Sequence, residues 1–272
     1  MKYTLFFVAI AALAQKSQPV PIGRDTVERE KARGAHLSAD YRSRTTFPDA
    51  PEVNAYLTEL GHRFAPAHYT FELVDEDRTL DSEPPSFPGG AIFVPASLIA
   101  AAKDQDELAA MLAHAVGHVQ HPVMSEGKVQ NFASIPMVMM AGPTGYAPSN
   151  KYIAVPLSFL PQLRAAELEA DRAAAGMLAQ AGIDPTAIYR YLDRTLLDPP
   201  ATGYFAGKSP YPPKAERLQS LQEAIAQLPL ANYATHPIPD SVRDTATQIV
   251  KRPDRPRPTL RRPGETPPSL RK

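Results

Sequence analysis

The chain has 272 residues, with 29 basic and 29 acidic side chains, so its formal net charge of +0 excludes the overall positive field of a general nucleic-acid-binding protein. Its length allows one core of substantial size, and its 0 cysteines exclude a disulfide framework. The composition therefore favours one folded domain that does not bind nucleic acid.

The first 14 residues have the pattern of a cleavable signal peptide. Met1-Lys2 precede an apolar run from Tyr3 to Ala14, which ends in the small-residue site Ala12-Leu13-Ala14. The run is shorter than the roughly 20 apolar residues that span a bilayer, and no cysteine follows it to carry a lipid anchor. We therefore expect export to a periplasm or the outside, with a mature chain that begins near Gln15 and has no transmembrane segment.

The expected elements then follow in chain order. Residues 15–50 are expected to form a helical and linker segment, with a charged helix over residues 28–41. Residues 51–228 are expected to form the main domain, mainly helical with a small sheet, which is an α+β architecture. Its expected strands cover residues 69–74 and 91–94, and its expected helices start at Pro51, Asp104, about Pro156, Asp184 and Pro213.

Two segments are expected to lie outside this core. Residues 122–150 contain an apolar stretch, Ile135 to Met140, which is either a lid or plug over a site or a buried loop. Residues 229–272 are expected to form a Pro-rich, basic, disordered tail, because residues 251–272 hold eight basic side chains, two acidic ones and six prolines. The tail is the candidate for peripheral contact with a membrane, and a solvated terminus is the alternative.

The helix expected after Asp104 carries His114 and His118 on one face. Residues at i and i+4 are neighbours on a helix, so both imidazoles can reach one metal ion. In the zinc-peptidase motif H-E-x-x-H, a glutamate follows the first histidine and moves the proton of the metal-bound water. Ala115 occupies that position, and a methyl group cannot carry a proton. The pattern therefore favours a metal site more strongly than it favours catalysis.

A second helix offers the acidic ligand that such a site needs. Glu167 and Asp171 are again four residues apart, so the first can bind zinc while the second orients a ligand histidine. The alternative is a solvated acidic face that pairs with Arg164 and Arg172.

Four motifs in this order resemble family 48 of the zinc metallopeptidases, the HtpX/BepA-like gluzincins. They are the Pro88-Gly89-Gly90-Ala91-Ile92-Phe93-Val94 strand, residues 106–119 around the histidines, Glu167 to Arg172, and Ala181 to Pro185. The resemblance covers roughly residues 50–220. It implies a zincin-like fold, Zn²⁺ held by His114, His118 and Glu167, Asp171 beside a ligand histidine, and hydrolysis of envelope or misfolded polypeptides.

The chain departs from the family at two positions. Ala115 replaces the general base, and Tyr211 stands where the family has a histidine, although Arg217 keeps the family's arginine. Tyr211 is a candidate for stabilising a substrate oxyanion. Because a general base contributes about 10²–10⁴ in rate, we expect hydrolysis to be weak or absent, and Ala115→Glu to raise it at least about a hundredfold. The alternative is a non-catalytic zinc protein that binds polypeptide clients. The oligomeric state is not indicated.

Overall fold

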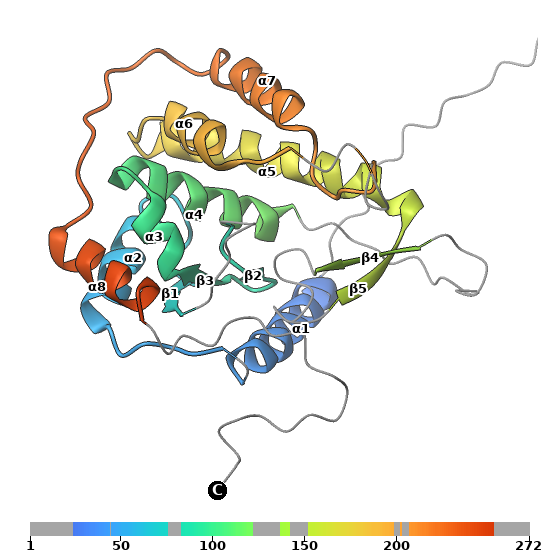
Figure 1. Ribbon diagram of the computed structural model, residues 1–272, viewed down its shortest axis with the longest axis horizontal. Helices are drawn as coiled ribbons and strands as arrows, with labels where there is room; N and C mark the ends of the chain where they lie inside the picture. Colours follow the sequence, from blue (N-terminus) through green and yellow to red (C-terminus); the bar gives the residue numbers. More distant parts are fainter. Residues whose placement is uncertain are drawn as a thin grey trace, which may run out of the picture.

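The computed structural model describes residues 24–43, 45–75, 83–121, 137–141, 152–198, 202 and 207–252. The predicted signal peptide, the mature start near Gln15, the last 20 residues of the predicted tail and most of the segment 122–150 lie outside these ranges. Within them, the fold is mainly helical around a small three-stranded sheet, as expected, and a separate two-stranded pair lies beside it (Figure 1).

The central sheet has three strands in the order β1-β3-β2. Strand β1 (Thr70–Val74) runs parallel to β3 (Ala91–Pro95), and the short β2 (Ser86–Phe87) is antiparallel to β3. Gly89 and Gly90 have φ values of 90° and 96° in the turn from β2 to β3, a conformation that favours glycine. A Cβ on Gly90 would also meet Tyr69 at 3.0 Å, so this turn requires a residue without a side chain.

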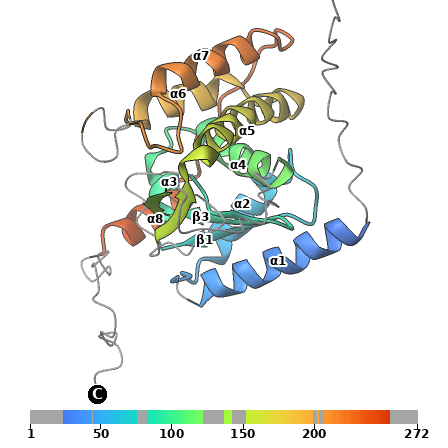
Figure 2. The same ribbon diagram turned by 90° about the vertical axis from the view of Figure 1, so that its right-hand side faces the viewer.

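The two faces of the sheet are covered by different helices. Because side chains alternate along a strand, neighbouring residues of β3 contact different helices. Phe93 of β3 packs with Tyr41 of the charged helix α1 (Arg24–Arg42), while Ile92 and Val94 belong to the main core. Figure 2 shows α1 on one side of the sheet and the remaining helical layers on the other.

The main core lies between the sheet and a stack of helices. Helices α2 (Pro51–Gly61) and α4 (Gln105–Gln120) contact the strands, and α5 (Leu160–Gln180) packs on α4. Helices α6 (Thr186–Thr195) and α7 (Lys214–Ile225) cover α4 and α5 from outside (Figures 1 and 2). Helix α4 is therefore buried along nearly its whole length.

Several helix ends follow from the predicted signals. The side chain of Asp104 accepts a hydrogen bond from the Glu107 backbone N–H at 2.8 Å and caps α4, which ends before His121. Gly182, with φ 68°, follows α5, where the Ile183 N–H reaches the Leu178 carbonyl at 2.9 Å. The α-helical part of α5 starts at Leu160, later than expected, because a 3₁₀ turn (Leu157–Phe159) precedes it.

Five elements were not predicted from the sequence. They are β2, the short α3 (Ala96–Ala101), the antiparallel pair β4 (Met137–Ala141) and β5 (Tyr152–Pro156), and α8 (Asp240–Val250). Strand β4 is the described part of the predicted lid or plug.

Helix α8 corrects the start of the predicted disordered tail. Its buried side chains Val242, Ala246 and Ile249 lie at i, i+4 and i+7, and they pack it against α3 and α2. Arg243 adds hydrogen bonds to the carbonyls of Ala102 and Lys103, at 2.9 and 3.1 Å. The ordered chain therefore continues past residue 229, through α8.

Candidate metal centre

The close contact of α4 with α5 sets the geometry of the site. A Cβ on Gly117 would lie 3.0 Å from the Cα and the carbonyl oxygen of Ala170, so glycine allows the two helices to touch at this point. His114 and His118 lie on α4 on either side of this contact in sequence, and Glu167 and Asp171 flank Ala170 on α5. The helix crossing therefore brings the two predicted i,i+4 pairs face to face.

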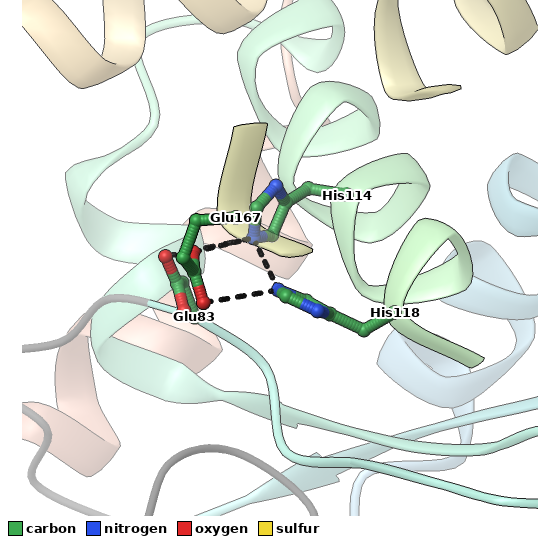
Figure 3. Close-up of side chains that lie close together, drawn as sticks. All are labelled: Glu83, His114, His118 and Glu167. Atoms are coloured by element: carbon green, nitrogen blue, oxygen red, sulfur yellow. Dashed lines mark hydrogen bonds and ion pairs between the residues drawn. The ribbon is translucent and has the colours of Figure 1, made fainter. Parts of the chain in front are cut away.

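The three predicted ligands converge through their side-chain tips (Figure 3). The Nε2 atoms of His114 and His118 are 3.0 Å apart. Glu167 lies across from both, with Oε2 3.6 Å from His114 Nε2 and Oε1 3.4 Å from His118 Nε2. His114 and Glu167 are buried, so these polar atoms face one another in the protein interior.

Asp171 lies behind His114, as a residue that orients a ligand histidine would. Its Oδ1 is 2.9 Å from His114 Nδ1, and its side chain is buried. A carboxylate at Nδ1 fixes the ring orientation and directs Nε2 toward His118 and Glu167. The alternative, a solvated acidic face, does not apply to Glu167 and Asp171, because both side chains are buried. Arg172 pairs instead with Glu169, which is exposed.

Glu83 is a fourth member of the cluster that the sequence reasoning missed. Its Oε1 is 3.5 Å from His114 Nε2, and ligand atoms of Glu83, His114, His118 and Glu167 all lie within 4.8 Å of one another. Figure 3 shows the Glu83 carboxylate beside that of Glu167. Glu83 precedes β2 and lies outside any helix, so no periodic pattern connected it to the histidines. The only signal in the sequence was a carboxylate just before two prolines and the strand.

Arg217, in the first turn of α7, connects the carboxylates of this cluster. The fully buried guanidinium donates from Nε to Asp171 Oδ2 at 2.6 Å, and from Nη1 and Nη2 to Glu83 Oε1 at 3.1 Å each. Nη2 also lies 3.3 Å from Glu167 Oε2. The sequence had singled out Arg217 as a family residue without giving it this role.

The electrostatics of the cluster favour a cation. Burial by itself would lower the pKa of His114, but the carboxylates of Glu83 and Asp171 outweigh burial and raise this pKa to about 10. Burial would raise the pKa of Asp171, yet Arg217 and His114 hold it below the usual range. Both Glu83 Oε2 and Glu167 Oε2 are buried without a hydrogen-bond partner among the described residues. Buried acceptors of this kind fit a bound metal ion.

The two predicted catalytic positions differ in what they offer. Ala115 follows His114 on α4 and is buried, with no group that can take up a proton. The backbone N–H of Tyr211 donates to Ser209 Oγ, and Arg164 of α5 holds the same segment through the carbonyls of Ser209 and Gly207. The segment 207–211 is thus attached to α5 one turn before Glu167.

Two histidines four residues apart on one helix, completed by an acid from the next helix, form the arrangement of a metal-dependent hydrolase. Residues 52–225 match Peptidase family M48, and the chain belongs to this family of metallopeptidases. The α+β fold is accordingly zincin-like, as the sequence motifs predicted.

A relative of known description supports the assignment. Over 235 residues the chain is 26% identical to the putative beta-barrel assembly-enhancing protease of Vibrio cholerae. The alignment covers 78% of this chain and 47% of the relative, so the chain spans about half the length of the relative it matches. In the described part of the chain, no helix has the length and apolar character needed to cross a membrane.

Proposed function

We propose that this chain is an exported zinc-binding domain of the M48 family in which peptide hydrolysis is weak or absent. The observation that carries the proposal is the convergence of His114, His118 and Glu167, with Asp171 behind His114. Two imidazoles and carboxylates form a donor set that suits zinc. Export rests on the predicted signal peptide at residues 1–14.

Each residue has a definite part in this proposal. His114, His118 and Glu167 would hold the zinc ion, which when bound acidifies water and polarises a carbonyl. Asp171 keeps Nε2 of His114 directed at the metal, and Arg217 pairs with the buried carboxylates and holds them in place. Ala115 has only a methyl side chain, so it cannot move a proton from water to the leaving amine.

The alternative function is a non-catalytic zinc protein that binds polypeptide clients, in a chaperone-like role in the envelope. Ala115 favours this non-catalytic function, because the site keeps its metal-binding residues but lacks the base that hydrolysis needs. The name of the Vibrio cholerae relative describes a protease, and polypeptides are therefore the substrate or client class that we propose for this chain.

The test compares cleavage and binding on the same polypeptide. Zinc-loaded protein is incubated with a dye-labelled unfolded polypeptide, with the His118→Ala variant as the metal-site control. We expect cleavage indistinguishable from the control, while fluorescence anisotropy reports a bound complex. Chelator-sensitive cleavage in the ordinary enzyme range of about 1–10³ s⁻¹ would contradict the proposal.

A further inference from the structure

We propose that Glu83 is a fourth protein ligand of the metal, which closes the site against water and substrate. The inference deepens the proposed function and rests on the metal centre proposed there. It concerns how the centre is completed: a catalytic zinc site keeps one position for water, whereas a structural site is filled by four protein ligands.

The four side chains are close enough together to bind one metal ion, since their ligand atoms all lie within 4.8 Å of one another. With metal–ligand bonds of about 2.0–2.1 Å, tetrahedral ligand atoms lie about 3.3–3.4 Å apart. The distance between the histidine Nε2 atoms is 3.0 Å, and Glu167 lies 3.6 and 3.4 Å from them. Glu83 Oε1 lies 3.5 Å from His114 Nε2, within the same narrow range. Glu83 is thus the one further carboxylate in the described cluster that is close enough to serve as a fourth ligand.

The charges of the buried cluster lead to the same assignment. Glu83, Glu167 and Asp171 contribute three negative charges, and Arg217 contributes one positive charge, so the cluster carries −2 when both histidines are neutral. A divalent cation neutralises this charge completely. Without Glu83 the occupied site would carry +1, a charge that favours a bound hydroxide. Glu83 removes the electrostatic reason for hydroxide to bind.

The position of Glu83 suits a ligand better than a relocated general base. A base must leave room for a water between its oxygen and the metal, with about 2.6–3.2 Å from water to base. Glu83 Oε1 is instead at ligand spacing from His114, and Arg217 donates to it from two nitrogens at 3.1 Å. The guanidinium holds this carboxylate in place. Ala115 and Glu83 therefore act in the same direction, since one removes the base and the other displaces the water.

The experiment uses cobalt as the probe, because four-coordinate Co²⁺ absorbs visible light strongly and an added ligand weakens and shifts the bands. Wild type, Glu83→Gln, Glu83→Ala and the control Glu169→Gln are loaded with Co²⁺ alone and then titrated with acetohydroxamate. Glu169 suits the control, because it lies two residues from Glu167 and is exposed, paired with Arg172. Metal affinity is measured by competition with a chelator.

We expect wild type and Glu169→Gln to give the four-coordinate spectrum without a response to acetohydroxamate. Both Glu83 variants should respond to acetohydroxamate and should bind Co²⁺ at least about tenfold more weakly. Loss of a group that only supports a metal ligand already lowers metal affinity by about this factor. Urea unfolding of the metal-free variants checks that they fold. If neither variant folds, the spectrum and hydroxamate response of wild type decide.

Three results would overturn the assignment. The first is a hydroxamate response in wild type, and the second is unchanged affinity and spectrum in folded Glu83 variants. The third is chelator-sensitive hydrolysis in wild type that Glu83→Gln abolishes without loss of metal affinity, which would make Glu83 a base. A wild type that binds neither Co²⁺ nor Zn²⁺ would overturn the proposed metal centre itself, and this outcome is distinct from the other three.

Discussion

Arg217 determines how charges are arranged in the interior of this protein. A single buried guanidinium contacts Asp171, Glu83 and Glu167, and these carboxylates face the two histidines. Isolated charges at such depth would be strongly destabilising, so the cluster is tolerated because its members pair with one another. With both histidines neutral, as metal binding requires, two negative charges remain and provide the electrostatic basis for binding a divalent cation.

Metal uptake should release a proton from His114. The pKa of this imidazole is raised to about 10 in the metal-free chain, so the proton is present at pH 7.5 and must leave when the metal binds. We expect about one proton per metal ion, and an affinity that rises about tenfold per pH unit below the raised pKa. Calorimetric titration with Zn²⁺ in buffers of different ionisation enthalpy measures the number, and a heat that is independent of buffer would contradict it.

The same shift has a consequence for the metal-free fold. A raised pKa stabilises the folded state fully below the unfolded value of 6.5, and that contribution is lost as pH rises through about 10. The free energy of unfolding without metal should therefore decline across this window through His114. Urea titrations at pH 6.5 and 9.5, with Asp171→Asn as a variant that has a smaller shift, measure the effect; an equal decline in both proteins would exclude Asp171 as a cause.

Restoring the missing carboxylate should require two changes. The sequence alone predicted that Ala115→Glu would raise hydrolysis at least about a hundredfold. With Glu83 as a fourth ligand we instead expect this single variant to stay nearly inactive, because Glu83 holds the position of the catalytic water. The double variant with Glu83→Ala should hydrolyse a peptide at least about a hundredfold faster than Glu83→Ala alone. The gain should disappear with a chelator or with His114→Ala. Equal rates for the double variant and for Glu83→Ala alone would contradict the role given to Ala115.

At the scale of elements, the contact of α4 with α5 is what assembles the site. Gly117 is the point of contact, since a Cβ there would be 3.0 Å from two backbone atoms of Ala170. Gly176 on α5 offers a matched comparison, because a Cβ there would meet nothing within 4 Å. The two positions differ in surroundings but share a helical backbone.

Gly117→Ala should lower the free energy of unfolding by about 1–3 kcal/mol, the usual cost of overpacking, and should weaken metal binding by moving the helices apart. Gly176→Ala should leave stability unchanged or raise it by up to about 1 kcal/mol, through helix propensity. Urea unfolding in the presence of a chelator, followed by metal titration, measures both effects. Equal stabilities for the two variants would show that the helix contact tolerates a side chain at residue 117.

At the scale of the molecule, α8 and the segment before it attach the C-terminal part of the chain to the start of α4, the helix that carries both histidines. The Gln105 N–H, at the start of α4, donates to the His236 carbonyl at 2.9 Å, and Arg243 contacts the carbonyls just before α4. The segment after α7 therefore passes around the outside of the core and returns to it (Figure 1).

Removing the anchor of α8 should destabilise the whole fold. Ile249 is buried, so Ile249→Ala is expected to cost about 2–5 kcal/mol in the free energy of unfolding. Leu230 is fully exposed, and Leu230→Ala should change that free energy by no more than about 0.5 kcal/mol. Chemical denaturation measures both variants. A cost for Ile249→Ala as small as that for Leu230→Ala would mean that α8 is not part of the cooperative core.

The sequence allowed the helical half of the site to be predicted, because His114, His118, Glu167 and Asp171 repeat at i,i+4 and helix geometry places such pairs on one face. Glu83 could not be found in this way, because a residue outside regular structure has no period that fixes its direction. Helix α8 was missed for a different reason: its three apolar residues at i, i+4 and i+7 were a valid signal, but prolines and charges on both sides favoured a disordered tail.

The most direct test of the central claim is metal analysis of protein purified and refolded without chelator. Wild type should contain about one zinc ion per chain, because three ligands on two packed helices remain without the general base. His118→Ala and Glu167→Ala should each lose the metal, while Glu169→Gln should keep it. Wild-type protein that is stably folded but free of metal, or variants that retain a full zinc ion, would contradict the ligand assignment and the function proposed from it.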